Sequence, residues 1–106
     1  EADADPLAVA QRELREETGH ISDYWLKLGV LAISPSRATV QMHLFAALNC
    51  TRAGEQSLDP NEEIIVHQRP LAEAVALARS GVIDAATSVA GLLLAAAELR
   101  ERGLVE

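Results

Sequence analysis

The chain has 106 residues, a net charge of −7 at pH 7 and a hydrophobic fraction of 49%. This length allows one domain with a single core, and the hydrophobic fraction is that of a globular protein rather than a disordered one. The excess of acidic residues argues against a nucleic-acid polymer as partner, because no basic stripe is available to displace phosphate counterions.

The expected core is thin. Much of the hydrophobic fraction is alanine, and the chain has one Phe, one Trp and one Tyr. Alanine buries little apolar area, and each Å² that is buried contributes only about 25 cal/mol. We therefore expect a second copy of the chain to add to the buried surface, which means a homo-oligomer.

Two features predict where the protein is located. The apolar run 91–99 is too short to cross a bilayer, and the N-terminal residues lack the basic start and apolar run of a signal peptide. Cys50 is the single cysteine, so no intramolecular disulfide can form and a reducing compartment is favoured. We expect a cytoplasmic protein with no membrane partner.

The first element in chain order is a helix. Asp5 followed by Pro6 predicts its start, with Asp5 as the N-cap and Pro6 at the first helical position. Apolar residues recur at helical spacing as far as Leu14, and Gly19 provides a left-handed stop.

Strands are expected next. The β-prone segments 24–33 and 40–48 predict two strands separated by the loop 34–39. The polar connection 49–62 follows, and binding loops are often found in connections of this kind. A short strand is expected from Ile64 to His67.

Two helices complete the predicted order. The first begins at Pro70 and runs through Ser80. Asp84 is expected to cap the last helix, which runs to about Arg102 and stops at Gly103. The sequence shows no internal repeat and no second domain, so we expect a single domain over residues 1–106.

The first helix carries three acidic residues on one face. Glu13, Glu16 and Glu17 stand at i, i+3 and i+4, where like charges disfavour the helix. In a partly buried setting the repulsion is about 4 kcal/mol for two charges about 4 Å apart at an effective dielectric of about 20. A divalent cation would reverse this penalty, and oxygen ligands suit Mg²⁺ or Mn²⁺. The alternative is a solvated face on which Arg12 pairs with Glu16, and spacing alone favours this second interpretation.

The segment "RELREETGH", residues 12–20, resembles the core of the Nudix box, G-x5-E-x7-R-E-U-x-E-E-x-G-U, in which U is a bulky apolar residue. The positions that match are Arg12, Glu13, Leu14, Glu16, Glu17 and Gly19. Pro35 stands sixteen residues after Gly19, and a proline at about that distance is typical of the ADP-ribose pyrophosphatase branch of the family. This motif outweighs the solvated interpretation.

The resemblance implies an α/β (α+β) fold, the Nudix-like α/β/α sandwich with a mixed sheet. Residues 1–106 would be a single partial domain that lacks the family's N-terminal strands. The implied activity is Mg²⁺-dependent (or Mn²⁺-dependent) hydrolysis of a nucleoside diphosphate linked to another moiety, such as ADP-ribose or a nucleotide sugar. The partner would then be a nucleoside diphosphate derivative as substrate.

The resemblance also implies roles for individual residues. Glu16 and Glu17 would be metal ligands, Glu13 would contribute to the metal site, and Arg12 would hold the glutamates by hydrogen bonds. In the loop before the short strand, Glu62 and Glu63 are candidates for a general base or a metal partner. The alternative for these two is a solvated loop charge.

The sequence departs from the family pattern at several positions. Ala4 stands where the first glutamate of the box is expected, and His20 occupies the final apolar position. Thr39 and Val40 stand where an acidic pair often follows the proline. These departures predict weaker metal binding and slower turnover. They leave open a catalytically inactive module, an oligomeric Nudix-like binding or scaffold protein.

Four other residues have structural interpretations. His43 and His67 are expected to be hydrogen-bonded structural histidines rather than catalytic ones. Trp25 and Phe45 are most simply core residues.

Overall fold

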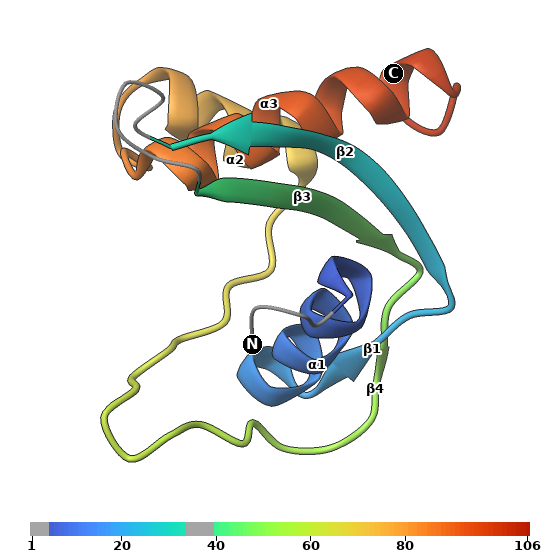
Figure 1. Cartoon of the computed structure of the whole chain (residues 1–106). Helices are drawn as coiled ribbons and strands as arrows, with labels where there is room; N and C mark the ends of the chain where they lie inside the picture. The colour runs from blue at the N-terminus through green and yellow to red at the C-terminus, as the bar shows by residue number, and fades with distance from the viewer. Residues whose placement is uncertain (1–4, 34–39) are drawn as a thin grey trace. The chain divides into compact units, whose positions relative to one another are not determined.

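The computed structural model describes residues 5–33 and 40–106 (Figure 1). Over these residues the elements in chain order are α1 (Pro6–Thr18), β1 (His20–Ile21), β2 (Tyr24–Ala32), β3 (Gln41–Leu48), β4 (Thr51–Arg52), α2 (Leu71–Arg79) and α3 (Ala86–Glu101). This mixture of helices and antiparallel strand pairs confirms the α+β class. None of the helices in the described ranges is long and apolar enough to cross a membrane.

The chain divides into two compact units. Unit 1 consists of residues 1–26 and 45–67, and unit 2 consists of residues 27–44 and 68–106. The prediction of a single Nudix-like domain over residues 1–106 stays a prediction.

Helix α1 in unit 1 begins and ends where the sequence predicts. Asp5 is the N-cap in an extended conformation, although its side chain makes no capping hydrogen bond; its carbonyl oxygen accepts from the Val9 N–H at 3.0 Å. At the other end Gly19 adopts the left-handed conformation, with φ 74°, and its N–H donates to the Arg15 carbonyl oxygen at 2.8 Å. The predicted glycine stop is confirmed.

A short strand pair follows the helix directly. β1 and β4 are antiparallel, with His20 opposite Arg52 and Ile21 opposite Thr51. Neither strand is predicted from the sequence, because two residues are too few to show the alternation that marks a strand. The pair brings the connection after β3 back to the C-terminal end of α1.

Trp25 and Phe45, two aromatic residues of unit 1, are half-buried and in contact. The Trp25 and Phe45 rings meet edge to face, with centroids 6.4 Å apart. The Trp25 indole N–H donates to the Ser22 carbonyl oxygen at 2.9 Å, and the Ser22 hydroxyl donates to the Leu48 carbonyl oxygen. The prediction that Trp25 and Phe45 are core residues holds only in part, because both side chains are half-buried rather than buried.

The strands predicted at 24–33 and 40–48 are confirmed as β2 and β3. They are neighbours in one sheet and run antiparallel (Figure 1). Pro35 and the predicted loop 34–39 lie outside the described residues. On β3, the His43 Nδ1 is buried without a hydrogen-bond partner among the described residues, so the expected hydrogen bond is not found at this nitrogen.

The helices of unit 2 pack against each other, α2 against α3. Within the described part of the chain the buried apolar residues are only Leu26, Ala78 and Ala96. The expectation of a thin core is therefore confirmed.

Two predicted features are wrong. Residues 64–67 form no strand, because they pair with no other strand in the described part of the chain, and Ile65 is 74% exposed. A β-prone run needs a pairing partner as well as propensity. Asp84 does not cap α3: the first carbonyl acceptor of that helix is Ala85, which accepts from the Val89 N–H at 2.9 Å.

Candidate metal and catalytic site

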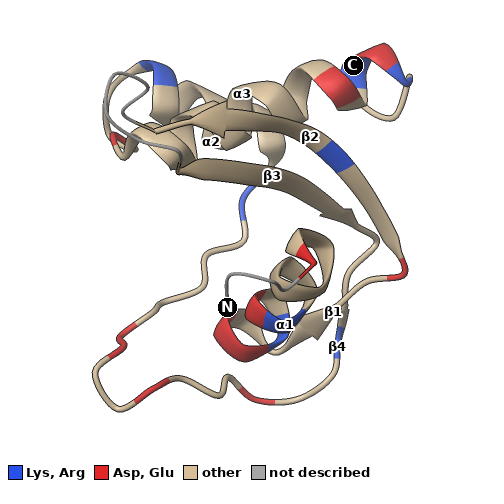
Figure 2. Cartoon of the chain, viewed as in Figure 1, with Lys and Arg blue, Asp and Glu red and all other residues tan. Residues whose placement is uncertain are grey.

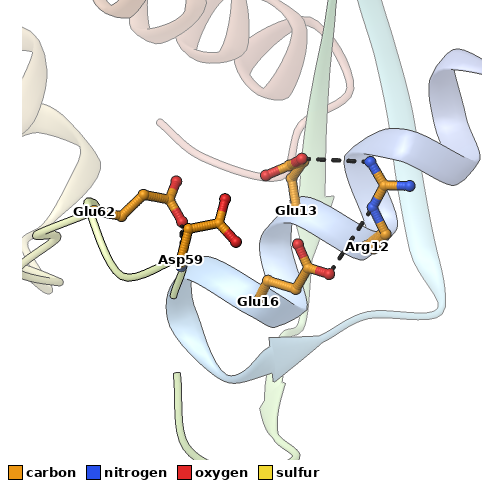
Figure 3. Close-up of polar contacts among 5 residues, drawn as sticks. All are labelled: Arg12, Glu13, Glu16, Asp59 and Glu62. Carbon is orange, nitrogen blue, oxygen red and sulfur yellow. Dashed lines mark hydrogen bonds and ion pairs between the residues drawn. The ribbon is translucent and has the colours of Figure 1, made fainter. Parts of the chain in front are cut away.

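The acidic face of α1 lies at the surface of unit 1, beside arginines of the same helix (Figure 2). The Arg12 guanidinium is 3.5 Å from the Glu13 carboxylate and 4.0 Å from the Glu16 carboxylate (Figure 3). The glutamate side chains are 43% and 41% exposed, so each ion pair contributes about 0–1 kcal/mol to stability. The pairing of Arg12 with Glu16 that the solvated interpretation expects is present, but it is weak.

Glu17 has the most perturbed environment of the three glutamates. Several causes together raise the pKa of Glu17 from 4.5 to about 7, of which the largest is a hydrogen bond with the Glu13 side chain and the next is partial burial. The charges of Glu13, Glu62 and Glu16 contribute to the same shift. Protonated Glu17 can donate to the Glu13 carboxylate, which removes the repulsion between them.

A long connection is hydrogen-bonded to the C-terminal end of α1. We call residues 53–67, which contain no helix or strand, the acidic loop. The N–H groups of Ala53 and Gly54 donate to the Gly19 carbonyl oxygen at 2.7 and 3.2 Å, and the Ser57 N–H donates to the Glu16 carbonyl oxygen at 2.7 Å. The sequence predicts a polar connection here. These bonds hold the first limb of the acidic loop, residues 53–57, at the C-terminal end of α1.

The acidic loop turns back between Asp59 and Glu62. The Asp59 N–H donates to the Glu62 carboxylate at 2.8 Å, and the Glu62 N–H donates to the Asp59 carbonyl oxygen at 2.9 Å. Both side chains are drawn with Glu13 and Glu16 in Figure 3. The charge of Glu62 contributes to the raised pKa of Glu17, so this predicted loop acid acts electrostatically on the helix acids.

Not every candidate is brought to the site. Glu63 is exposed and makes no hydrogen bond or ion pair with the described residues. Asp59, which accompanies Glu62, was not among the predicted site residues. The signal was the turn sequence "DPNE", in which Asp-Pro favours turn initiation. Ala4 and Thr39 lie outside the described residues, whereas Val40 is exposed just before β3.

The donor set fits a hard divalent cation in its chemistry. All candidate atoms are carboxylate oxygens, and Glu13 and Glu17 are close enough to share a proton, which a cation could replace. However, no group of three or more His, Cys, Asp or Glu side chains in residues 5–33 and 40–106 is arranged to hold a metal ion. The metal-binding roles of Glu13, Glu16 and Glu17 therefore stay predictions.

Comparison with known proteins reveals two hydrolases that are similar to this chain. It is 37% identical over 100 residues to a GDP-mannose pyrophosphatase of Cronobacter sakazakii, a match that covers 92% of this chain and 51% of that protein. Its fold matches the crystal structure of an ADP compounds hydrolase with a TM-score of 0.73 and 29% sequence identity, over 92% of this chain and 52% of that one. These likenesses support the Nudix family.

Two further findings define the extent of these similarities. No family model matches the chain. The chain spans about half the length of the curated relative and of the solved structure that it matches. The structural match confirms the expected α+β fold over 92% of this chain.

The free energy of unfolding should depend on pH through Glu17 on helix α1. Because the pKa of Glu17 is raised in the folded chain, this group contributes stability that is fully present below about pH 4.5 and is lost as the pH rises through about 7. In EDTA, we expect the Tm of the wild type to fall between about pH 5 and pH 8 relative to that of Glu17→Gln, measured by circular dichroism. Glu101→Gln, an exposed change on α3, keeps Glu17, and its Tm should follow that of the wild type over the same pH range. A wild-type Tm that stays parallel to that of Glu17→Gln would contradict the expectation.

Proposed function

We propose that this chain catalyses the hydrolysis of a nucleoside diphosphate linked to another moiety, with Mg²⁺ or Mn²⁺ as cofactor. The observation that carries the proposal is the placement of Glu62 beside the Nudix-like acidic face of α1. The identity of the relatives, which are named for GDP-mannose and for ADP compounds, supports the same class of substrate.

The proposed roles follow from the contacts. Glu13, Glu16 and Glu17 would hold the cation, which when bound neutralises the charge that develops on the diphosphate. Arg12, within ion-pair distance of Glu13 and Glu16, would keep these two carboxylates oriented. Protonated Glu17 would have to lose its proton before it could act as a ligand.

The loop acid would handle the proton of the attacking water. One carboxylate oxygen of Glu62 accepts from the Asp59 N–H, which holds the side chain in place and leaves the second oxygen to take a proton. Glu63, which has no such anchor among the described residues, is the second candidate for this role.

The test is an assay of the purified chain with ADP-ribose, GDP-mannose and related dinucleotides, with Mg²⁺, with Mn²⁺ and with EDTA. We expect nucleoside monophosphate to be released with either cation and not with EDTA, detected by chromatography. Thermal unfolding in the same buffers should show a higher Tm with the cation, because a ligand that binds only the folded state stabilises it. Absence of both turnover and cation-dependent stabilisation would sink the enzyme proposal.

A second candidate is a catalytically inactive, oligomeric Nudix-like module. It is favoured by the exposure of large apolar side chains among the described residues, such as Val40, Ile65 and Val82, which are 56%, 74% and 70% exposed. A second copy of the chain could cover apolar surface of this kind. A stable, folded monomer in sedimentation would count against the oligomer.

The location that we propose is the cytoplasm, in keeping with the free and exposed Cys50.

A further inference from the structure

Gln56 joins three parts of unit 1 through one side-chain amide. Its Nε2 group donates to the Glu17 carbonyl oxygen at 2.7 Å and to the Ile64 carbonyl oxygen at 3.0 Å. A carboxamide nitrogen carries two protons, so both hydrogen bonds can form at once. The side chain thus connects the last turn of α1 to the returning limb of the acidic loop.

The other hydrogen bonds between the acidic loop and α1 involve only the first limb. In the described chain they are made by the backbone N–H groups of Ala53, Gly54 and Ser57, and none reaches beyond residue 57. The returning limb, residues 58–64, is therefore tied to the helix through the amide of Gln56 at Ile64.

Glu62 lies on that returning limb, two residues before Ile64. Its position relative to the first limb is restricted by the turn from Asp59, which holds both the Glu62 N–H and its carboxylate. The turn is a local unit, so it moves with the limb to which it belongs. Without the bond at Ile64, these contacts would keep the turn intact but would not keep it beside α1.

We propose that Gln56 is a positioning residue, which holds the Glu62 carboxylate beside the acidic face of α1 by bridging the Glu17 and Ile64 carbonyl groups. The catalytic part of this inference rests on the proposed function of Glu62. The geometric part does not, because it concerns only where the returning limb lies. Displacement of a catalytic group by about 1 Å can lower the rate by up to about 100-fold.

The test uses two substitutions with opposite hydrogen-bonding ability. Gln56→Met keeps the side-chain length and removes both donors, whereas Gln56→Lys supplies an ammonium group that can donate to both carbonyl groups. Gln11→Met, the same change at an exposed position on α1, is the matched control. Helix content measured by circular dichroism should be equal in all four proteins.

The first readout is hydrogen–deuterium exchange, which needs no turnover. In Gln56→Met we expect faster exchange over residues 58–64, with exchange of α1 unchanged, and we expect Gln56→Lys and Gln11→Met to behave as the wild type does. Unchanged exchange in Gln56→Met, or equal acceleration in Gln11→Met, would overturn the positioning role whether or not the chain is an enzyme.

The second readout is steady-state turnover. We expect Gln56→Met to lower kcat by about 10-fold or more with KM changed by less than about twofold, because a misplaced base affects the chemical step rather than binding. Gln56→Lys should recover most of the loss. Faster exchange with unchanged kcat would overturn the link to Glu62. Absence of turnover in the wild type would remove the proposed function, and the exchange result alone would then decide the geometric part.

Discussion

Glu16→Gln is expected to reduce cation-dependent turnover by about 100-fold or more and to weaken the stabilisation by Mg²⁺. The change replaces one carboxylate oxygen by an NH2 group, which keeps the shape and removes the negative charge that a hard cation needs. Loss of groups that only support metal ligands already costs about 10–100-fold, so loss of a ligand should cost at least that much.

The structure predicts that this loss is not due to unfolding. The Glu16 side chain is 41% exposed, and its ion pair among the described residues, with Arg12, is 4.0 Å long, so its removal changes stability by about 0–1 kcal/mol. The measurements are kcat, KM and the Tm with increasing Mg²⁺. Glu101→Gln, on α3, provides the matched control and should keep the wild-type values. Wild-type turnover by Glu16→Gln would remove Glu16 from the site.

Local sequence signals predicted the elements whose cause is local. The start of α1 at Asp5, its end at Gly19 and the two longer strands depend on a few neighbouring residues, and each was found within about two residues of its predicted place. The α1 glutamates share a face because of the helical repeat, so the sequence also predicted the acidic side of the site.

The rest depends on contacts between residues far apart in the chain. The pairing of β1 with β4 joins His20 to Arg52, and the hydrogen bond from Gln56 to Glu17 spans 39 residues. No periodicity encodes such pairs, so Gln56 could not be recognised from the sequence as part of the site. Ile64–His67 failed as a strand for the same reason, because propensity does not supply a partner.

Gly19→Ala is expected to be the most destabilising of the proposed changes, for two independent reasons. Gly19 has φ 74°, a left-handed conformation that costs a residue with a Cβ about 1–2 kcal/mol. The new Cβ would also run into the Gly54 carbonyl oxygen and lie 3.1 Å from the Gly54 carbonyl carbon. These are backbone atoms, so no side-chain rotation can relieve the contact, and overpacking of this kind costs about 1–3 kcal/mol.

Gly81→Ala separates the two contributions. Gly81 also has a left-handed φ, 88°, but a Cβ there would meet nothing within 4 Å, so this variant should lose only the backbone part. In urea unfolding at equilibrium, we expect Gly19→Ala to lose on the order of 2–5 kcal/mol and Gly81→Ala about 1–2 kcal/mol. Equal losses in the free energy of unfolding would show that the acidic loop can move away at Gly54 without cost. A larger loss at Gly19 would show that the end of α1 and the acidic loop form one rigid contact, which is the condition for Glu62 to be held beside the helix.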